Sequence, residues 1–151
     1  MSGLSPAQVL ELLPQQEPFR FIDDILALDE EHIVSSYRFR PEADFYRGHF
    51  PGNPVTPGVI LIESMAQAGI VALGIYLLSL EGDGFDSGRM MTLFTDANVE
   101  FSGLVKPGDR VTVDATKVFW RRRKLRVEAQ MKLEGGALVC SGTVSGMGVM
   151  T

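Results

Sequence analysis

The chain has 151 residues, a formal net charge of −5 at pH 7, and 45% hydrophobic and 22% charged residues. A chain of this size builds one core, so we predict a single domain over residues 1–151. The acidic balance disfavours nucleic-acid binding, because no basic field is present to attract phosphates. The single cysteine, Cys140, excludes a disulfide framework, and with only two histidines, His32 and His49, we expect no metal site.

The first thirteen residues, MSGLSPAQVLELL, lack the basic flank and the long apolar region of a secretory signal. We therefore expect a protein of the reducing cytoplasm. Residues 5–13 predict a short helix, with Ser5 as its N-cap and Pro6 at its first position. Gln8 follows Ser5 at the spacing of a capping box.

The next predicted elements are two strands, over residues 19–28 and 32–39, joined by a turn at 29–31. After a proline-rich stretch, a Pro-Gly pair opens a long helix over residues 57–80. Most of this helix carries no charge, but its uncharged part is slightly short for a membrane span, and a carboxylate inside lipid would be costly. We therefore predict a core helix and no membrane insertion.

The last third of the chain is strand-like. Residues 81–88, rich in glycine and acids, predict a solvated loop. Alternating apolar and polar residues then predict four strands with hairpin-like links, over residues 89–103, 110–120, 124–134 and 137–150. A helix that is apolar on most faces must be packed against other parts of the protein on most of those faces. We therefore predict an α+β fold, in which a curved antiparallel sheet wraps around one long apolar central helix.

His49 is the first residue that we expect to carry chemistry. Gly48 lets the backbone pass close to another group, and Phe50 offers an apolar wall that would keep the imidazole neutral. A neutral imidazole is a competent general base near pH 7. The alternative is a histidine that only packs near a strand end. His32, in the sequence EEHIV, lacks such a context, and we expect a solvated turn residue there.

Glu63 stands in an apolar run with no basic residue within one turn. It lies past the first helical turn, where the favourable effect of the helix dipole on the anion has faded. Desolvation should therefore raise its pKa and give a protonated carboxyl, as a general acid requires. Gln67 lies four residues further on the same helix face and either holds the Glu63 carboxyl or a water, or is a polar core residue satisfied by backbone groups.

The segment between these two groups is stiffened by prolines at every third position, Pro51, Pro54 and Pro57. They restrict the backbone, and an extended segment of this length would carry His49 far from the helix start. Gly58, at that start, presents an N–H without an intrahelical acceptor and has no Cβ to block a substrate oxygen. Such a donor stabilises an oxyanion; the alternative is a flexible residue after a proline.

A basic run stands out in this acidic chain. It comprises Arg121, Arg122, Arg123 and Lys124, with Arg126 close by. This run is either a solvated hairpin or a docking site for an acidic partner or a phosphate group.

The sequence GHFPGNPVTPGVILIESMAQ, residues 48–67, resembles the signature of the FabZ-type β-hydroxyacyl-[acyl carrier protein] dehydratases of bacterial fatty-acid synthesis. That family has the pattern HFPxxPxxPGV, followed by a glutamate and then by Met-Ala-Gln, and every fixed element has a match here. Weaker similarity extends over nearly the whole chain, including LLPQQEPFRFIDDI and FWRRRKLRVEAQMKLEGGALV.

The resemblance implies a hotdog fold and a homodimer, alone or as a trimer of dimers, with active sites at the dimer interface. It implies His49 and Glu63 as catalytic residues. Substrate-binding positions would be Phe50, Gly58, Val59 and Gln67. The substrate would be a (3R)-3-hydroxyacyl group on acyl carrier protein, converted to the trans-2-enoyl thioester, with no cofactor beyond the substrate's own phosphopantetheine.

Two alternatives stay open: an acyl thioesterase on the same fold, and a non-catalytic acyl-binding subunit. The related FabA type, which also isomerises the double bond, has an aspartate where this chain has Glu63, and this favours plain dehydration. Near the N-terminus the family has an arginine where this chain has Asp24. That departure is compatible with a dedicated secondary pathway that has its own carrier protein.

Overall fold

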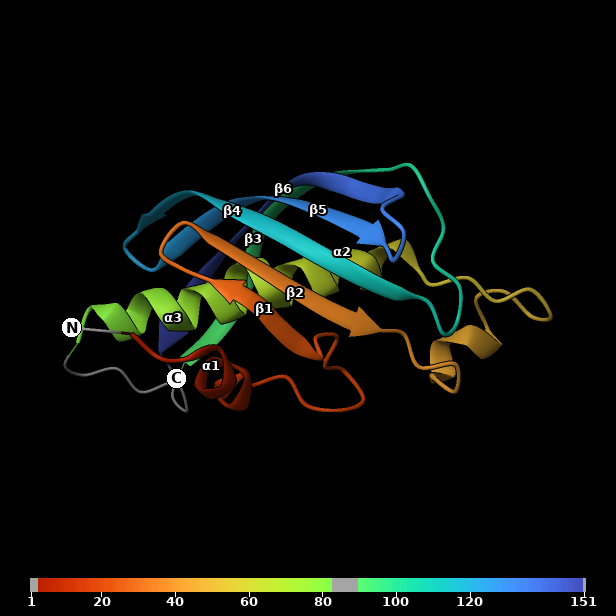
Figure 1. Ribbon diagram of the computed structural model, residues 1–151, viewed down its shortest axis with the longest axis horizontal. Coiled ribbons are helices and arrows are strands. Elements are labelled where there is room, and N and C mark those ends of the chain that lie inside the picture. Colours follow the sequence, from red (N-terminus) through yellow and green to blue (C-terminus); the bar gives the residue numbers. More distant parts are fainter. Residues whose placement is uncertain (1–2, 83–89, 151) are drawn as a thin grey trace.

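The computed structural model describes residues 3–82 and 90–150. Six antiparallel strands form one sheet in the order β1-β2-β4-β5-β6-β3, and this sheet curves around a long helix (Figure 1). This arrangement is the α+β fold predicted from the sequence. The strands are β1 (Asp24–Leu28), β2 (His32–Arg38), β3 (Met90–Phe101), β4 (Arg110–Arg121), β5 (Lys124–Leu133) and β6 (Leu138–Met150).

The short helix α1 (Pro6–Leu12) confirms the predicted capping box at the N-terminus. The Ser5 hydroxyl accepts a hydrogen bond from the Gln8 N–H, and the Gln8 side chain accepts one from the Ser5 N–H. These bonds satisfy donors that would otherwise be free at the helix start. Helix α1 packs against the end of the central helix that lies farthest from Gly58, and this packing buries Val9 and Leu13.

The central helix runs from Gly58 to Leu80, as predicted, but it is not α-helical throughout. It consists of α2 (Gly58–Ala66), the π-helical segment η2 (Gln67–Ala72) and α3 (Leu73–Leu80). Its length and apolar character would suit a membrane span, yet 72% of its most apolar window is buried inside the fold. A Cβ on Gly69 would lie 2.8 Å from the Val127 side chain, so a glycine here lets the helix approach the sheet closely.

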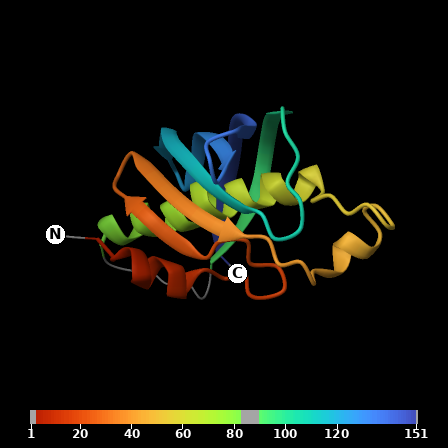
Figure 2. The same cartoon turned by 45° about the vertical axis from the view of Figure 1, so that its right-hand side comes forward.

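The inner face of the sheet supplies the other half of the core. Every second residue is buried along β5 and in the first half of β4, including Val111, Val113, Val127 and Met131. This alternation is the predicted period of a half-buried strand. The view in Figure 2 shows the helix passing under the concave side of the sheet.

Two predictions about local structure were wrong. The hairpin links β4–β5 and β5–β6 are confirmed, but β3 pairs with β6 and not with β4, so residues 102–109 cross to another strand of the sheet. His32 is not a turn residue, because it begins β2 and its Nε2 lies 2.6 Å from Asp114 Oδ1. Most of the predicted 81–88 loop lies outside the described residues.

Candidate active site

His49 lies on a tight loop and not on an extended segment. The Phe50 N–H donates to the Asn53 carbonyl and the Asn53 N–H to the Phe50 carbonyl, with Gly52 at φ 74° between them. The Val55 N–H then donates to the His49 carbonyl at 2.9 Å. The chain therefore turns back on itself, and the expected extended reach of the proline-rich segment is wrong. In Figure 1 this loop projects beyond the start of α2.

The base of the loop is fixed to the body of the protein at Tyr46 and Thr56, both of which are buried. The Tyr46 hydroxyl and Thr56 Oγ1 are 2.6 Å apart, and the Thr56 N–H donates to the Val105 carbonyl at 2.8 Å. Burial raises the pKa of Tyr46. These bonds hold the His49 loop in one position relative to the sheet.

The hydrogen bond of His49 defines its tautomer. Its Nδ1 lies 2.9 Å from the Val55 carbonyl oxygen. Because a carbonyl only accepts, Nδ1 carries the hydrogen, and in the neutral imidazole Nε2 is left as an acceptor. The Phe50 ring stacks on the imidazole at a centroid distance of 4.3 Å, while 55% of Phe50 is itself exposed. The predicted apolar wall is present beside a nitrogen that is free to accept a proton.

Glu63 is half-buried in the second turn of α2. Burial raises the pKa of its carboxyl, while the hydrogen bond from Gln67 lowers it, and burial is the larger effect. This direction is the one predicted from the apolar run around Glu63. A carboxyl with a raised pKa holds its proton closer to neutral pH and is able to donate it.

Gln67 is fully buried and uses its amide entirely on protein groups. Its Nε2 donates to Glu63 Oε2 at 2.9 Å and to the Phe19 carbonyl at 2.9 Å, while its Oε1 accepts from the Phe21 N–H at 2.7 Å. The Ser64 hydroxyl adds a bond to the Phe21 carbonyl at 2.8 Å. Gln67 thus orients Glu63 and also joins the helix to the segment before β1, so both sequence interpretations of this residue hold.

Gly58 is the first residue of α2, and its N–H has no acceptor within the helix. A Cβ at this position would lie 3.1 Å from the Phe101 ring, so the glycine allows β3 to pack against the helix start. Val59, next to it, is 72% exposed. Both predicted substrate positions therefore lie at an open face of the helix start, next to an aromatic side chain that sequence reasoning did not identify.

Within one chain the structure joins Glu63 to Gln67 but not to His49. No hydrogen bond links the Glu63 carboxyl and the His49 imidazole among the described residues. Instead, the carboxyl faces a cavity lined by Gln15, Ala66 and residues of β3 and β6. The acid and the base are thus presented by separate parts of the chain.

The basic run forms the β4–β5 turn, at the α3 end of the central helix and far from Gly58 (Figures 1 and 2). Arg122 and Arg123 have φ values of 52° and 63°. Arg121 lies over the Phe119 ring, as does Arg126, whose guanidinium also lies 3.3 Å from Asp96. No described group of three or more His, Cys, Asp or Glu residues is arranged to hold a metal ion.

Comparison with known proteins places this fold and these residues in a family. Residues 13–143 match the model of the FabA-like domain. A 3-hydroxyacyl-[acyl-carrier-protein] dehydratase FabZ from Lactobacillus helveticus is 32% identical over 146 residues, which cover 96% of this chain and 93% of the relative. The FabZ dehydratase of Thermus thermophilus is 31% identical over 85% of this chain and 86% of its own length. The chain belongs to the FabA-like family, and it is similar to FabZ dehydratases along most of its length.

Solved structures confirm the hotdog architecture that the sequence resemblance implies. The dehydratase heterocomplex ApeI:P from Xenorhabdus doucetiae superposes with a TM-score of 0.76 at 14% identity, covering 95% of this chain and 91% of that chain. A thioesterase from Haemophilus influenzae superposes with a TM-score of 0.67 at 18% identity, covering 97% and 92%. Because proteins with different activities share this fold, these likenesses define the architecture alone.

Proposed function

We propose that this chain is a cytoplasmic dehydratase that converts (3R)-3-hydroxyacyl-[acyl carrier protein] to the trans-2-enoyl thioester and water. The observation that carries the proposal is a pair of groups, one arranged to donate a proton and the other to accept one. Glu63 is held by Gln67 with a raised pKa, and His49 has Nδ1 protonated, so that its Nε2 is left to accept a proton. The curated relatives named as FabZ dehydratases support this reaction.

In the proposed mechanism, His49 Nε2 removes a proton from C2 of the thioester, and negative charge develops on the thioester oxygen. The Gly58 N–H donates a hydrogen bond to that oxygen. Glu63 gives its proton to the C3 hydroxyl, the C3–O bond breaks, and water leaves as the C2–C3 double bond forms. His49 then loses a proton and Glu63 regains one, so the enzyme returns to its starting state.

The competing activity on this fold is thioester hydrolysis, in which a carboxylate activates water and no histidine is needed. Dehydration is favoured because the tautomer of His49 leaves Nε2 as an acceptor nitrogen on a fixed loop. The test is to incubate the protein with one 3-hydroxyacyl thioester and measure both conjugated enoyl product and free thiol. Enoyl product without free thiol supports the proposal, whereas free thiol alone would assign the protein to the thioesterases.

The complete site is proposed to form in a homodimer through the edge strand β3. This strand of 12 residues pairs on one side with β6, and its other edge has no neighbour in the described sheet. Met91, Leu93, Phe94 and Phe101 on it are all close to half-exposed. A long apolar edge strand needs cover, and a second copy related by a two-fold axis supplies it.

Such a pairing would also bring the acid and the base together. Two β3 strands related by a two-fold axis run antiparallel, so the Met90 end of one lies beside the Phe101 end of its partner. Because Gly58 packs on Phe101, the helix start and the His49 loop of one chain would approach the Glu63 cavity of the other, which is lined by Leu93 and Phe94. We propose that each active site combines His49 of one chain with Glu63 of its partner.

The proposed dimer would also bring the basic run of one chain toward its partner. Lys124 is paired with Met147, and Met147 with Leu93, so the β4–β5 turn lies toward the Met90 end of β3. In the proposed dimer that end approaches the partner's helix start. We propose that Arg121, Arg122, Arg123 and Lys124 dock the acidic carrier protein that delivers the substrate.

A further inference from the structure

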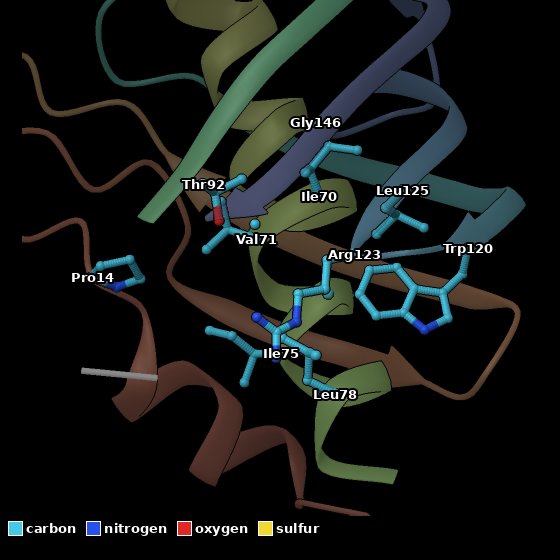
Figure 3. A pocket seen from close by; sticks show the side chains of 12 residues that line it. Pro14, Ile70, Val71, Ile75, Leu78, Thr92, Trp120, Arg123, Leu125 and Gly146 are labelled. Atoms are coloured by element: carbon cyan, nitrogen blue, oxygen red, sulfur yellow. The ribbon is translucent and has the colours of Figure 1, made fainter. Parts of the chain in front are cut away.

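A second cavity, shown in Figure 3, adjoins the cavity beside Glu63. The two share the lining residues Ile70, Val71, Thr92 and Gly146. The second cavity extends to Ile75 and Leu78, which are roughly 18 to 22 Å beyond Glu63 along the helix at 1.5 Å per residue. The two adjoining cavities therefore follow the helix from Glu63 toward its α3 end, and we refer to them together as the path.

The walls of this path suit a hydrocarbon chain. Ile75 and Leu78 from α3 face Leu125 and Trp120 from the sheet, and all four line the cavity. The Trp120 indole N–H is already bound to Glu81 Oε2 at 2.9 Å, so this donor is not available to a ligand. An acyl chain that enters past Glu63 would lie among apolar groups over this distance.

Arg123 is a charged residue among the mostly apolar residues that line the α3 end of the cavity. Its side chain points into the cavity, with the guanidinium lying over Ile75 and Leu78 (Figure 3). Within residues 3–82 and 90–150, no carboxylate forms an ion pair with it, whereas its neighbour Arg126 is paired with Asp96. Arg123 is exposed at the edge of the cavity, where its guanidinium is able to bind an anion through charge-assisted hydrogen bonds.

The backbone adds an independent observation. Arg122 and Arg123 are the two central residues of the β4–β5 turn, and both have positive φ. Two-residue turns of this kind strongly prefer Asn-Gly or Asp-Gly, because side chains with a Cβ are strained there. Backbone strain that is retained beside a cavity suggests that the strained residues have a functional role. Of these two strained residues, Arg123 is the one that lines the cavity.

We infer that Arg123 recognises the far end of the acyl chain, and that the enzyme prefers acyl groups with a carboxylate at that end. The inference rests on the proposed function, since it names the substrate class of the same site. It leaves Arg121, Arg122 and Lys124 for docking of the carrier protein, because a guanidinium that binds the acyl chain is not available to the carrier. A guanidinium binds a carboxylate through two parallel hydrogen bonds, which also fixes the distance between the carboxylate and the reacting thioester. The preference should therefore peak at one chain length.

Trp120, the single tryptophan of the chain, lines the cavity and provides a direct binding signal. The probes are saturated acyl pantetheines of increasing length, each with either a methyl or a carboxylate end, which bind without reacting. Tryptophan fluorescence then gives the ratio of the two affinities at each length. At the optimal length, we expect this ratio to fall about tenfold or more in Arg123→Met and to be partly retained in Arg123→Lys. Lys132→Met, which removes a positive charge from an exposed site on β5, should leave the ratio unchanged.

Equal ratios in the wild type and Arg123→Met at every length would overturn the inference. The inference would also be overturned if Arg123→Met changed only the dissociation of the dimer, because Arg123 would then be an interface residue. Turnover of the matching 3-hydroxyacyl pantetheines separates this inference from the proposed function. If no enoyl product forms while the carboxylate preference depends on Arg123, the dehydratase assignment fails and the binding inference stands.

Discussion

The Gln67 side chain donates a hydrogen bond to the Glu63 carboxyl, one turn earlier on the same helix, across 2.9 Å. The same amide is bound to the backbone of Phe19 and Phe21. The proposed acid is therefore positioned by a segment that precedes it by more than forty residues. This link makes the protonation of Glu63 sensitive to a buried side chain one turn further along the helix.

Replacing Gln67 by methionine should raise the pKa of Glu63 further. The Gln67 hydrogen bond stabilises the carboxylate and lowers this pKa, so its removal leaves burial unopposed. Because a general acid acts in its protonated form, the pH above which kcat falls should move upward. The pH profiles of kcat for the wild type and Gln67→Met test this, and an unchanged upper limit would show that Gln67 does not act through Glu63. Ser64→Ala, which removes a bond to the same segment without touching the carboxyl, is the control for a merely structural effect.

His49→Ala and Glu63→Gln should each lose turnover while the fold is retained. Loss of a positioned acid or base costs roughly 10²–10⁴-fold in rate. Initial rates of enoyl formation, with circular dichroism as the check on folding, measure this effect. A folded variant with near-normal kcat would remove that residue from its proposed role.

Glu63→Gln should also change the dependence of stability on pH. A carboxyl whose pKa is raised in the folded state favours folding at low pH, and this contribution is lost as pH rises through the folded-state pKa. The wild type should therefore lose stability relative to Glu63→Gln as the pH rises from 4.5, the ordinary pKa of this carboxyl, through the raised pKa of the folded state. Urea unfolding of both proteins over a series of pH values measures the difference. Parallel changes in both would contradict a raised pKa at Glu63.

Mixing the two inactive variants should restore activity if the site is composite. A mixed dimer of His49→Ala and Glu63→Gln has one site with both lesions and one site with none. Random exchange makes half of the dimers mixed, so activity should reach roughly a quarter of the wild-type value by that symmetry. If both residues of a site came from one chain, every site would keep a lesion, and no recovery would follow subunit exchange. Recovery only with an unrelated hotdog subunit would instead indicate a heterocomplex.

Reversing the charges of Arg121 and Arg122 should raise KM for carrier-bound substrate and leave a pantetheine substrate unaffected. Both side chains are exposed, so added salt should reproduce the effect by screening over about 8 Å at physiological ionic strength. Steady-state kinetics with the two substrates at two salt concentrations are the measurement. Equal changes for both substrates would favour a solvated hairpin with no docking role.

Local features of this protein could be predicted well, because they depend on neighbouring residues. The spacing of Ser5, Pro6 and Gln8 encodes a cap, and the apolar run after Pro57 encodes a helix. The His49 loop was predicted wrongly, although its Pro-Gly and Asn-Pro pairs are turn signals that outweigh the extending effect of prolines. The sequence carried no signal for the bonds from Gln67 to Phe19 and Phe21, because they use backbone atoms that every residue has. Likewise, the pairing of β3 with β6 depends on the closure of the whole sheet and not on alternation within either strand.

The π-helical segment at Gln67–Ala72 has a consequence for how this family member is able to change. A π turn holds one residue more than an α turn, and one residue corresponds to about 100° of rotation around an α-helix. Because the extra residue is accommodated within the π turn, deleting a single residue between Gln67 and Ala72 would restore regular winding and leave Ile75 and Leu78 facing nearly the same side. A deletion within α2 or α3 would instead rotate the rest of the helix by about 100°. The π segment is therefore where this helix is able to lose a residue while Glu63 and the α3 residues keep facing their cavities.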